Sequence, residues 1–134
     1  DLVKPAEVLE AAYNDPPGAT TQARFRLNQL AYFSRCFDGD VVLHRFYPRA
    51  HYVPETTTVE GHLYATEDQT LTLAALDHTL GLRRGDSICQ GHSVKFHRPE
   101  LIDRLCAFGF ELDAEWIDAA WQYGLFLFVR TPGR

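Results

Sequence analysis

Apolar residues recur at helical spacing in two stretches at the start of the chain. The first stretch predicts a helix over residues 5–13, with Pro5 suited to its first turn. The second predicts a helix that runs to about Cys36 and is capped by Thr20 or Thr21. An Asn-Asp-Pro-Pro-Gly run separates the two helices. The apolar positions are Val8, Leu9 and Ala12 in the first helix and Leu27, Leu30, Ala31 and Phe37 in the second.

The pattern changes to alternation in the middle of the chain. Val59, Gly61, Leu63 and Ala65 alternate with Glu60, His62 and Tyr64. Such alternation is typical of a half-buried strand. The stretches 41–47 and 70–73 are also rich in strand-forming residues. These features predict a β-rich lobe over residues 39–96, with hairpins at residues 54–57 and 66–69.

Helical spacing returns after Phe96. Pro99 suits the start of a helix and Gly109 suits its end. Strands are predicted at residues 112–117 and 125–129, and the second is continuously apolar, as expected for a strand covered on both faces. The order of elements predicts an α/β fold, which is α+β within this chain, with the lobe inserted into a larger sheet.

Composition and charge narrow the possible partners. The chain has 134 residues and a net charge of −5, without a cluster of Lys and Arg, which argues against nucleic acid and anionic membranes. No apolar run approaches the roughly 20 residues that span a bilayer, and no signal peptide is recognisable. Three widely spaced cysteines predict free thiols and a cytoplasmic location. The first residue is Asp1 and the chain has no Met, so we expect a fragment of a longer protein.

Three groups of short motifs follow one another along nearly the whole chain. The first group is DLVK at 1–4, AYND at 12–15, GAT at 18–20 and FRLN at 25–28. The second is GD at 85–86 and SVKF at 93–96, and the third is FGF at 108–110, WID at 116–118 and the strand at 126–129. In this order they resemble the DLVK, AYDD, GVT, FNxN, GE…ExSxK and AGF…WTD motifs of the histidine-specific, S-adenosylmethionine-dependent methyltransferases of the ergothioneine pathway.

The resemblance implies the C-terminal portion of a Rossmann-like methyltransferase. Residues 1–38 and 97–134 would belong to the methyltransferase domain, and residues 39–96 would form the inserted substrate-binding lobe. The cofactor, S-adenosylmethionine, would be bound mainly upstream, because no G-x-G-x-x-G occurs here. The implied reaction methylates the α-amino group of histidine or a related aromatic amino acid, a small-molecule partner. The oligomeric state is not predicted.

The resemblance also implies two residues that contact the amino-acid substrate. Tyr13 matches the tyrosine of AYDD, which contacts the backbone end of the substrate. Ser93 matches the serine of ExSxK, which contacts the substrate side chain. Methyl transfer depends on positioning, so we expect neither a catalytic residue nor a metal ligand in this chain. We interpret Lys95 as a structural charge partner.

Two positions of the implied pocket depart from the family pattern. Gly91 replaces a glutamate that grips the imidazole, and Gly61 replaces a bulky residue, often Met. Both changes remove side-chain volume, which predicts a wider, less acidic pocket that could take a larger aromatic amino acid. Alternatively, Gln90 or His92 fills the space, or the activity is lost.

Three other readings remain open. Cys89, His92 and His97 have a passing likeness to zinc-ligand spacing, with a fourth ligand from elsewhere. Ser87 follows Gly-Asp, as in the nucleophile turn of some esterases. The chain could also be a non-catalytic, β-rich binding module without a cofactor site, whose uncovered sheet face would need a partner chain.

Overall fold

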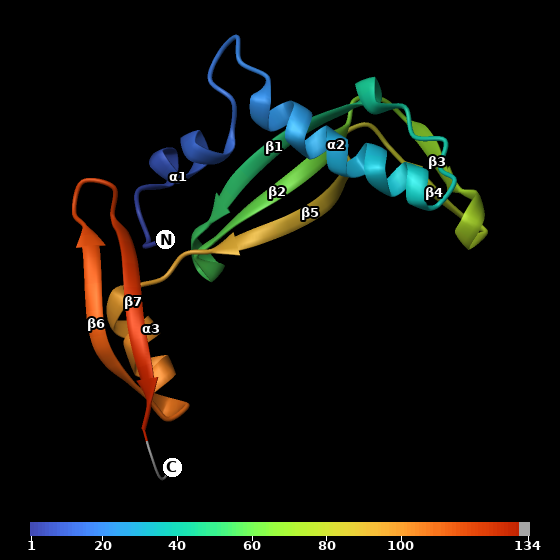
Figure 1. The fold of residues 1–134 in the computed structure, drawn as a ribbon. Coiled ribbons are helices and arrows are strands. Elements are labelled where there is room, and N and C mark those ends of the chain that lie inside the picture. Colours follow the sequence, from blue (N-terminus) through green and yellow to red (C-terminus); the bar gives the residue numbers. More distant parts are fainter. Residues whose placement is uncertain (132–134) are drawn as a thin grey trace.

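The computed structural model describes residues 1–131 and shows an α+β fold with antiparallel sheets (Figure 1). The helices are α1 (Ala6–Tyr13), α2 (Thr21–Cys36) and α3 (Arg98–Ala107). The strands are β1 (Phe46–Val53), β2 (Thr58–Ala65), β3 (Gln69–Leu73), β4 (His78–Leu82), β5 (Ser87–Val94), β6 (Phe110–Asp118) and β7 (Tyr123–Arg130). All three predicted helices and the two predicted C-terminal strands are therefore confirmed. The last three residues of the predicted part 97–134 lie outside the described residues.

The centre of the lobe is a three-stranded antiparallel sheet in the order β1-β2-β5. The alternation predicted for β2 is confirmed, because Val59, Leu63 and Ala65 are buried at 2%, 0% and 1% exposure. These residues occupy alternate positions of β2, so their side chains point to the same face of the sheet. Helices α1 and α2 cover that face (Figure 1). Burying this apolar surface between helix and sheet is the main source of stability for such a layer.

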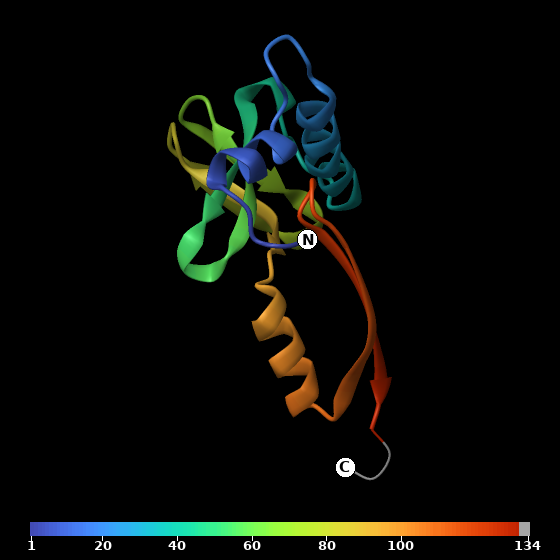
Figure 2. The same ribbon diagram turned by 90° about the vertical axis from the view of Figure 1, so that its left-hand side faces the viewer.

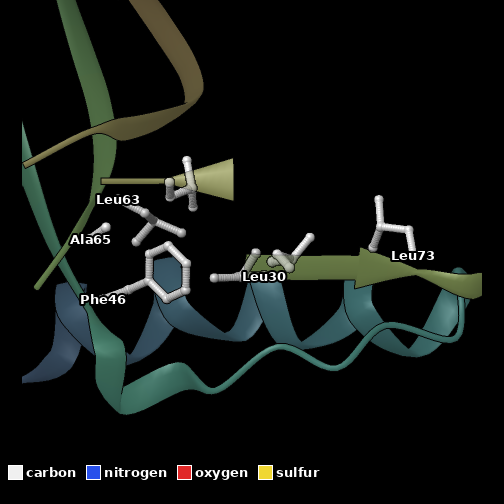
Figure 3. Close-up of a cluster of buried hydrophobic side chains, with 7 residues drawn as sticks. Leu30, Phe46, Leu63, Ala65 and Leu73 are labelled. Carbon is white, nitrogen blue, oxygen red and sulfur yellow. The ribbon is translucent and has the colours of Figure 1, made fainter. Parts of the chain in front are cut away.

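Two hydrophobic clusters fill the space between the helices and the sheet. The larger joins α2, the sheet and the β3–β4 hairpin, and Figure 3 shows Leu30 of α2 beside Phe46, Leu63 and Ala65 of the sheet. Its buried members are Leu30, Phe46, Leu63, Ala65, Leu71, Leu73 and Leu82. The smaller lies under α1 and contains Leu9, Ala50 and Val59. The two clusters hold the two helices on one side of the same sheet.

Two details of the predicted lobe are wrong. The hairpin at residues 54–57 is present, but the chain at 66–69 does not form one, because β2 pairs with β5 and β3 pairs with β4. Strand β3 instead turns its leucines toward α2, where they join the larger cluster. Residues 41–45 are not a strand either, since Leu43–Arg45 forms a 3-10 turn and β1 begins at Phe46.

The free edge of β1 is closed by α1 and by a proline. Asn14 accepts a 2.8 Å hydrogen bond from the amide of Ala50 and donates one of 3.0 Å to its carbonyl. Glu10 accepts a 3.0 Å bond from the amide of Tyr52. Pro48 occupies the preceding outward-facing position and has no amide hydrogen. The edge therefore leaves few unpaired amides that another strand could join.

Helix α3 and the β6–β7 hairpin extend away from the lobe (Figure 2). Arg98 of α3 holds Glu115 of β6 through two hydrogen bonds of 2.7 and 2.6 Å. The apolar side chains of β7 are largely exposed, with Leu125 at 62% and Leu127 at 46%. The predicted cover on both faces of this strand is therefore not supplied by residues 1–131. Within that part of the chain, no helix combines the length and apolar character needed to cross a membrane.

Candidate functional site

The N-terminal segment joins motifs that are far apart in the sequence. It runs parallel to the chain just after β5, with Val3 donating to the carbonyl of Phe96 and Phe96 donating to that of Asp1, both at 3.1 Å. On its other side, Leu2 donates a 3.2 Å bond to the carbonyl of Gln122, in the β6–β7 turn. The first and second motif groups therefore meet at residues 1–3, and the turn that follows the WID motif of the third group lies against them.

Tyr13, Ser93 and Lys95 form one hydrogen-bonded cluster beside this segment. The phenol of Tyr13 lies 3.0 Å from the Ser93 hydroxyl, although the residues are 80 positions apart. The ammonium of Lys95 donates to both oxygens, at 2.6 Å to Tyr13 and 2.8 Å to Ser93. Lys95 is 1% exposed, and its ammonium also lies 3.5 Å from a carboxylate oxygen of Asp1. The two residues implied by the resemblance are thus neighbours.

The direction of these hydrogen bonds determines what the cluster can bind. An ammonium has only donors, so Lys95 uses acceptor capacity on both hydroxyl oxygens. Tyr13 donates its hydrogen to the Ser93 oxygen, so the hydrogen of the Ser93 hydroxyl remains to donate outward. The cluster therefore presents a polarised donor beside a buried cation, which suits an oxygen acceptor such as a carboxylate.

The same contacts change the ionisation of Tyr13. Burial opposes a phenolate and acts to raise the pKa of this phenol. The hydrogen bonds from Lys95 and with Ser93, together with the positive charges of Lys95 and Arg26, act in the opposite direction. The net result is a Tyr13 pKa below the ordinary tyrosine value. Tyr13 is consequently a better hydrogen-bond donor than an isolated phenol.

Lys95 has a larger part in the site than its interpretation as a structural charge partner implies. It touches both Tyr13 and Ser93, so it is a member of the cluster and not only a structural charge. The sequence contained the necessary signal, because Ser93 and Lys95 are two positions apart at the end of β5. In an extended chain, side chains that are two positions apart point to the same face.

The residues after Tyr13 hold the site in place. Asn14 docks on β1, as described above, and Asp15 caps α2 through bonds of 2.8 Å and 2.7 Å from the amides of Gln22 and Ala23. The predicted N-cap position is confirmed at Thr20, but the Thr20 side chain makes no capping hydrogen bond, and Asp15 makes these bonds instead. The Asp15 carboxylate, which lies at the N-terminus of α2, also interacts favourably with the positive end of the helix dipole.

Tyr13 opens onto a cavity of about 440 Å³ between the α1–α2 loop, the start of α2 and β1. Its charged lining residues are Asp15, Arg26 and Arg49. Two guanidinium groups thus face one carboxylate, whose oxygens both accept hydrogen bonds from α2, so the lining of the cavity carries more positive than negative charge. A larger cavity of about 610 Å³ lies between α2 and the β3–β4 hairpin, but leucine and aromatic side chains dominate its lining and Tyr13 is not among them.

The two glycines of the implied pocket face each other across β2 and β5. Gly61 pairs with Gly91 at an irregularity of the ladder. The space above Gly61 is filled by Arg26 of α2, because a Cβ atom built on Gly61 would overlap Arg26 Nη1 and lie 2.8 Å from Cζ. Gly91 has φ +148°, which disfavours a side chain, and a Cβ there would meet nothing within 4 Å. The wider space expected at Gly61 is therefore occupied, and by neither Gln90 nor His92.

The serine suggested by the esterase reading also has polar neighbours. Ser87 lies 3.0 Å from Nδ1 of His62, and Glu60 lies 3.1 Å from Nε2 of the same ring. All three are on the face of the sheet opposite the helices, where Ser87 is exposed.

The alternative of a zinc site at Cys89, His92 and His97 has no counterpart in the described structure. Residues 1–131 bring no three His, Cys, Asp or Glu side chains together in a way that could hold a metal ion.

Comparison with known proteins gives a consistent result. Residues 1–130 match the family described as histidine-specific methyltransferase, SAM-dependent. The chain is 34% identical over 128 residues to the histidine N-alpha-methyltransferase of Mycobacterium tuberculosis (strain CDC 1551 / Oshkosh), covering 95% of this chain and 39% of that protein. It is 32% identical over 130 residues to the histidine N-alpha-methyltransferase of Mycolicibacterium smegmatis (strain ATCC 700084 / mc(2)155), covering 97% and 40%. It therefore spans about two-fifths of the length of these curated relatives.

Proposed function

Because the chain belongs to the family of histidine-specific, S-adenosylmethionine-dependent methyltransferases, we propose that it forms the acceptor-binding part of an amino-acid N-methyltransferase. The acceptor would be histidine or a related amino acid, methylated on its α-amino group. The observation that carries the proposal is the cluster of Tyr13, Ser93 and Lys95, which unites two of the family's motif groups at one site.

The chemistry of the cluster fits the backbone end of an amino acid. A methyl acceptor must present a neutral amine in line with an electrophilic methyl group, and orientation supplies much of the rate. The outward hydroxyl donor, backed by the Lys95 ammonium, would hold the substrate carboxylate. In this role Tyr13 and Ser93 orient the substrate and take no proton from it. Removing the Tyr13 hydroxyl should therefore weaken acceptor binding.

The described residues do not form a cradle for S-adenosylmethionine. The step from β5 to α3 passes through Lys95, Phe96 and His97 without a glycine, so it lacks the glycine-rich turn that lets a nucleotide approach a helix N-terminus. We propose that the cofactor, which supplies the methyl group, binds mainly to a Rossmann-like part of the protein outside this chain.

The β6–β7 hairpin supports that division. One face carries exposed apolar side chains from both strands, including the paired residues Trp116 at 57% and Leu125 at 62%. A hairpin of this composition needs cover, and a larger sheet flanked by helices would provide it. We therefore propose that residues 1–38 and 97–134 belong to the methyltransferase domain, with residues 39–96 as the inserted lobe.

The test is methyl transfer by the full-length protein with S-adenosylmethionine and a panel of histidine, tryptophan and tyrosine. We expect one or more of them to be methylated, and Tyr13→Phe to raise KM by about tenfold, as loss of one hydrogen bond to a charged group predicts. Tyr123→Phe, at an exposed position on β7, is the matched control. Gly91→Glu should shift selectivity toward histidine if the pocket is where we place it. Failure to methylate any amino acid would refute the proposal.

A further inference from the structure

The side chain of Arg26 is partly buried but has no anionic partner among residues 1–131. It comes from α2 and extends over Gly61 of β2, where any larger residue would overlap its guanidinium. Its Nε atom is buried and has no hydrogen-bond partner within residues 1–131. The side chain also makes no ion pair with any described residue. Keeping a guanidinium partly buried without a partner is costly, and an anionic ligand would offset the cost.

Three carboxylates on neighbouring elements already have other partners. Asp15 lines the same cavity but caps α2 with both oxygens. Glu10 accepts from the amide of Tyr52 at the edge of β1. Glu60 lies on the opposite face of the sheet, 3.1 Å from His62. None of these three carboxylates is hydrogen-bonded to Arg26.

Arg26 also lies beside the cluster that we propose for acceptor binding. It lines the cavity onto which Tyr13 opens, and its charge contributes to the lowered pKa of Tyr13. The guanidinium and the hydroxyl group of Tyr13, which is hydrogen-bonded to Ser93, thus lie at one cavity. A planar carboxylate can accept two parallel hydrogen bonds from a guanidinium and still leave lone pairs for a hydroxyl donor.

We infer that Arg26, whose side chain fills the space above Gly61, is a further substrate-binding residue that binds a carboxylate of the acceptor amino acid in the cavity onto which Tyr13 opens. This inference rests on the proposed function. The carboxylate can be the α-carboxylate, which every amino-acid acceptor carries, or the side-chain carboxylate of an acidic acceptor. The chemistry at Arg26 is the same in both cases, so the choice of acceptors in the experiment distinguishes them.

The experiment compares acceptors that differ only in one carboxylate, using the full-length protein. The pairs are L-histidine with L-histidinamide for the α-carboxylate, and L-glutamate with L-glutamine for the side-chain carboxylate. We expect the carboxylate form of one pair to be preferred by about 10- to 100-fold in kcat/KM, as charged hydrogen bonds imply. Arg26→Met should lower that ratio by about tenfold, because only the contact from the Tyr13–Ser93–Lys95 cluster remains, whereas Arg24→Met, an exposed arginine one half-turn away on α2, should leave the ratio unchanged.

The outcomes separate this inference from the function on which it rests. Equal use of both members of each pair by the wild-type protein would overturn the role of Arg26, and so would an unchanged ratio in a folded Arg26→Met variant. Calorimetric binding of the same four compounds gives a readout that does not need turnover. If no acceptor is methylated but binding still depends on the carboxylate and on Arg26, the proposed reaction fails and the role of Arg26 stands.

Discussion

Replacing Asn14 by alanine tests how α1 is held on the sheet. The side chain of Asn14 pairs with both the amide and the carbonyl of Ala50, which is 0% exposed. A buried polar group that loses its partner costs about 1–3 kcal/mol, and two groups are affected. Because truncation to alanine also lets some water reach the edge of β1, we expect a net loss of about 2–4 kcal/mol. At about 1.4 kcal/mol for each factor of ten, this corresponds to a change of about 30- to 700-fold in local opening.

Amide hydrogen exchange with residue resolution measures this effect directly, because exchange reports local opening free energies. In Asn14→Ala, the amide of Ala50 should exchange faster by that factor. The amide of Tyr52 bonds to Glu10 and serves as an internal comparison. The reciprocal variant Glu10→Ala should affect Tyr52 more than Ala50. If Ala50 stays as well protected in Asn14→Ala as in the wild type, our account of the β1 edge is wrong.

Three further predictions concern single contacts. Lys95→Met should raise the pKa of Tyr13, because the ammonium that stabilises the phenolate is lost. The change is measured by phenolate absorbance against pH, with the titration of the Tyr13→Phe variant subtracted. A fall in the pKa of Tyr13 would contradict the prediction. Asp15→Ala should cost about 1–2 kcal/mol of stability through loss of the α2 cap, measured by urea denaturation; Asp103→Ala, exposed on α3, should cost much less. Ser87→Ala should leave methyl transfer unchanged, and a large loss of activity would favour chemistry on the other face of the sheet.

The elements that the sequence predicted well are those with an unbroken period. The alternation along β2 places Leu63 and Ala65 on one face, and the structure buries both. The helix after Pro99 and the strands that follow it were similarly clear, because their start and stop residues frame a regular pattern. Local periodicity identifies an element, and the neighbours of that element then decide only its details.

The pairing of strands could not be predicted in the same way. Strands β2 and β3 are adjacent in sequence and looked like a hairpin, but β2 pairs with β5 across an intervening hairpin. Period-two patterns do not say which strand is the partner, since every strand has the same backbone donors and acceptors. Arg26 was missed for a related reason, because only the fold places α2 above Gly61. A charged residue on a helix gives no sign in sequence that it will be partly buried.

The three residues from Tyr13 to Asp15 together set the geometry of the site. Helix α1 ends at Tyr13, and Asn14 is extended, with φ −119° and ψ 152°, so the successive side chains leave the backbone in different directions. Tyr13 points to the cluster, Asn14 binds the edge of β1, and Asp15 caps α2. Since α2 carries Arg26, one short segment positions both proposed carboxylate-binding groups. Loosening Asn14 should therefore disturb Tyr13 first, and loosening Asp15 should disturb Arg26 first, because each anchor holds a different helix of the same wall.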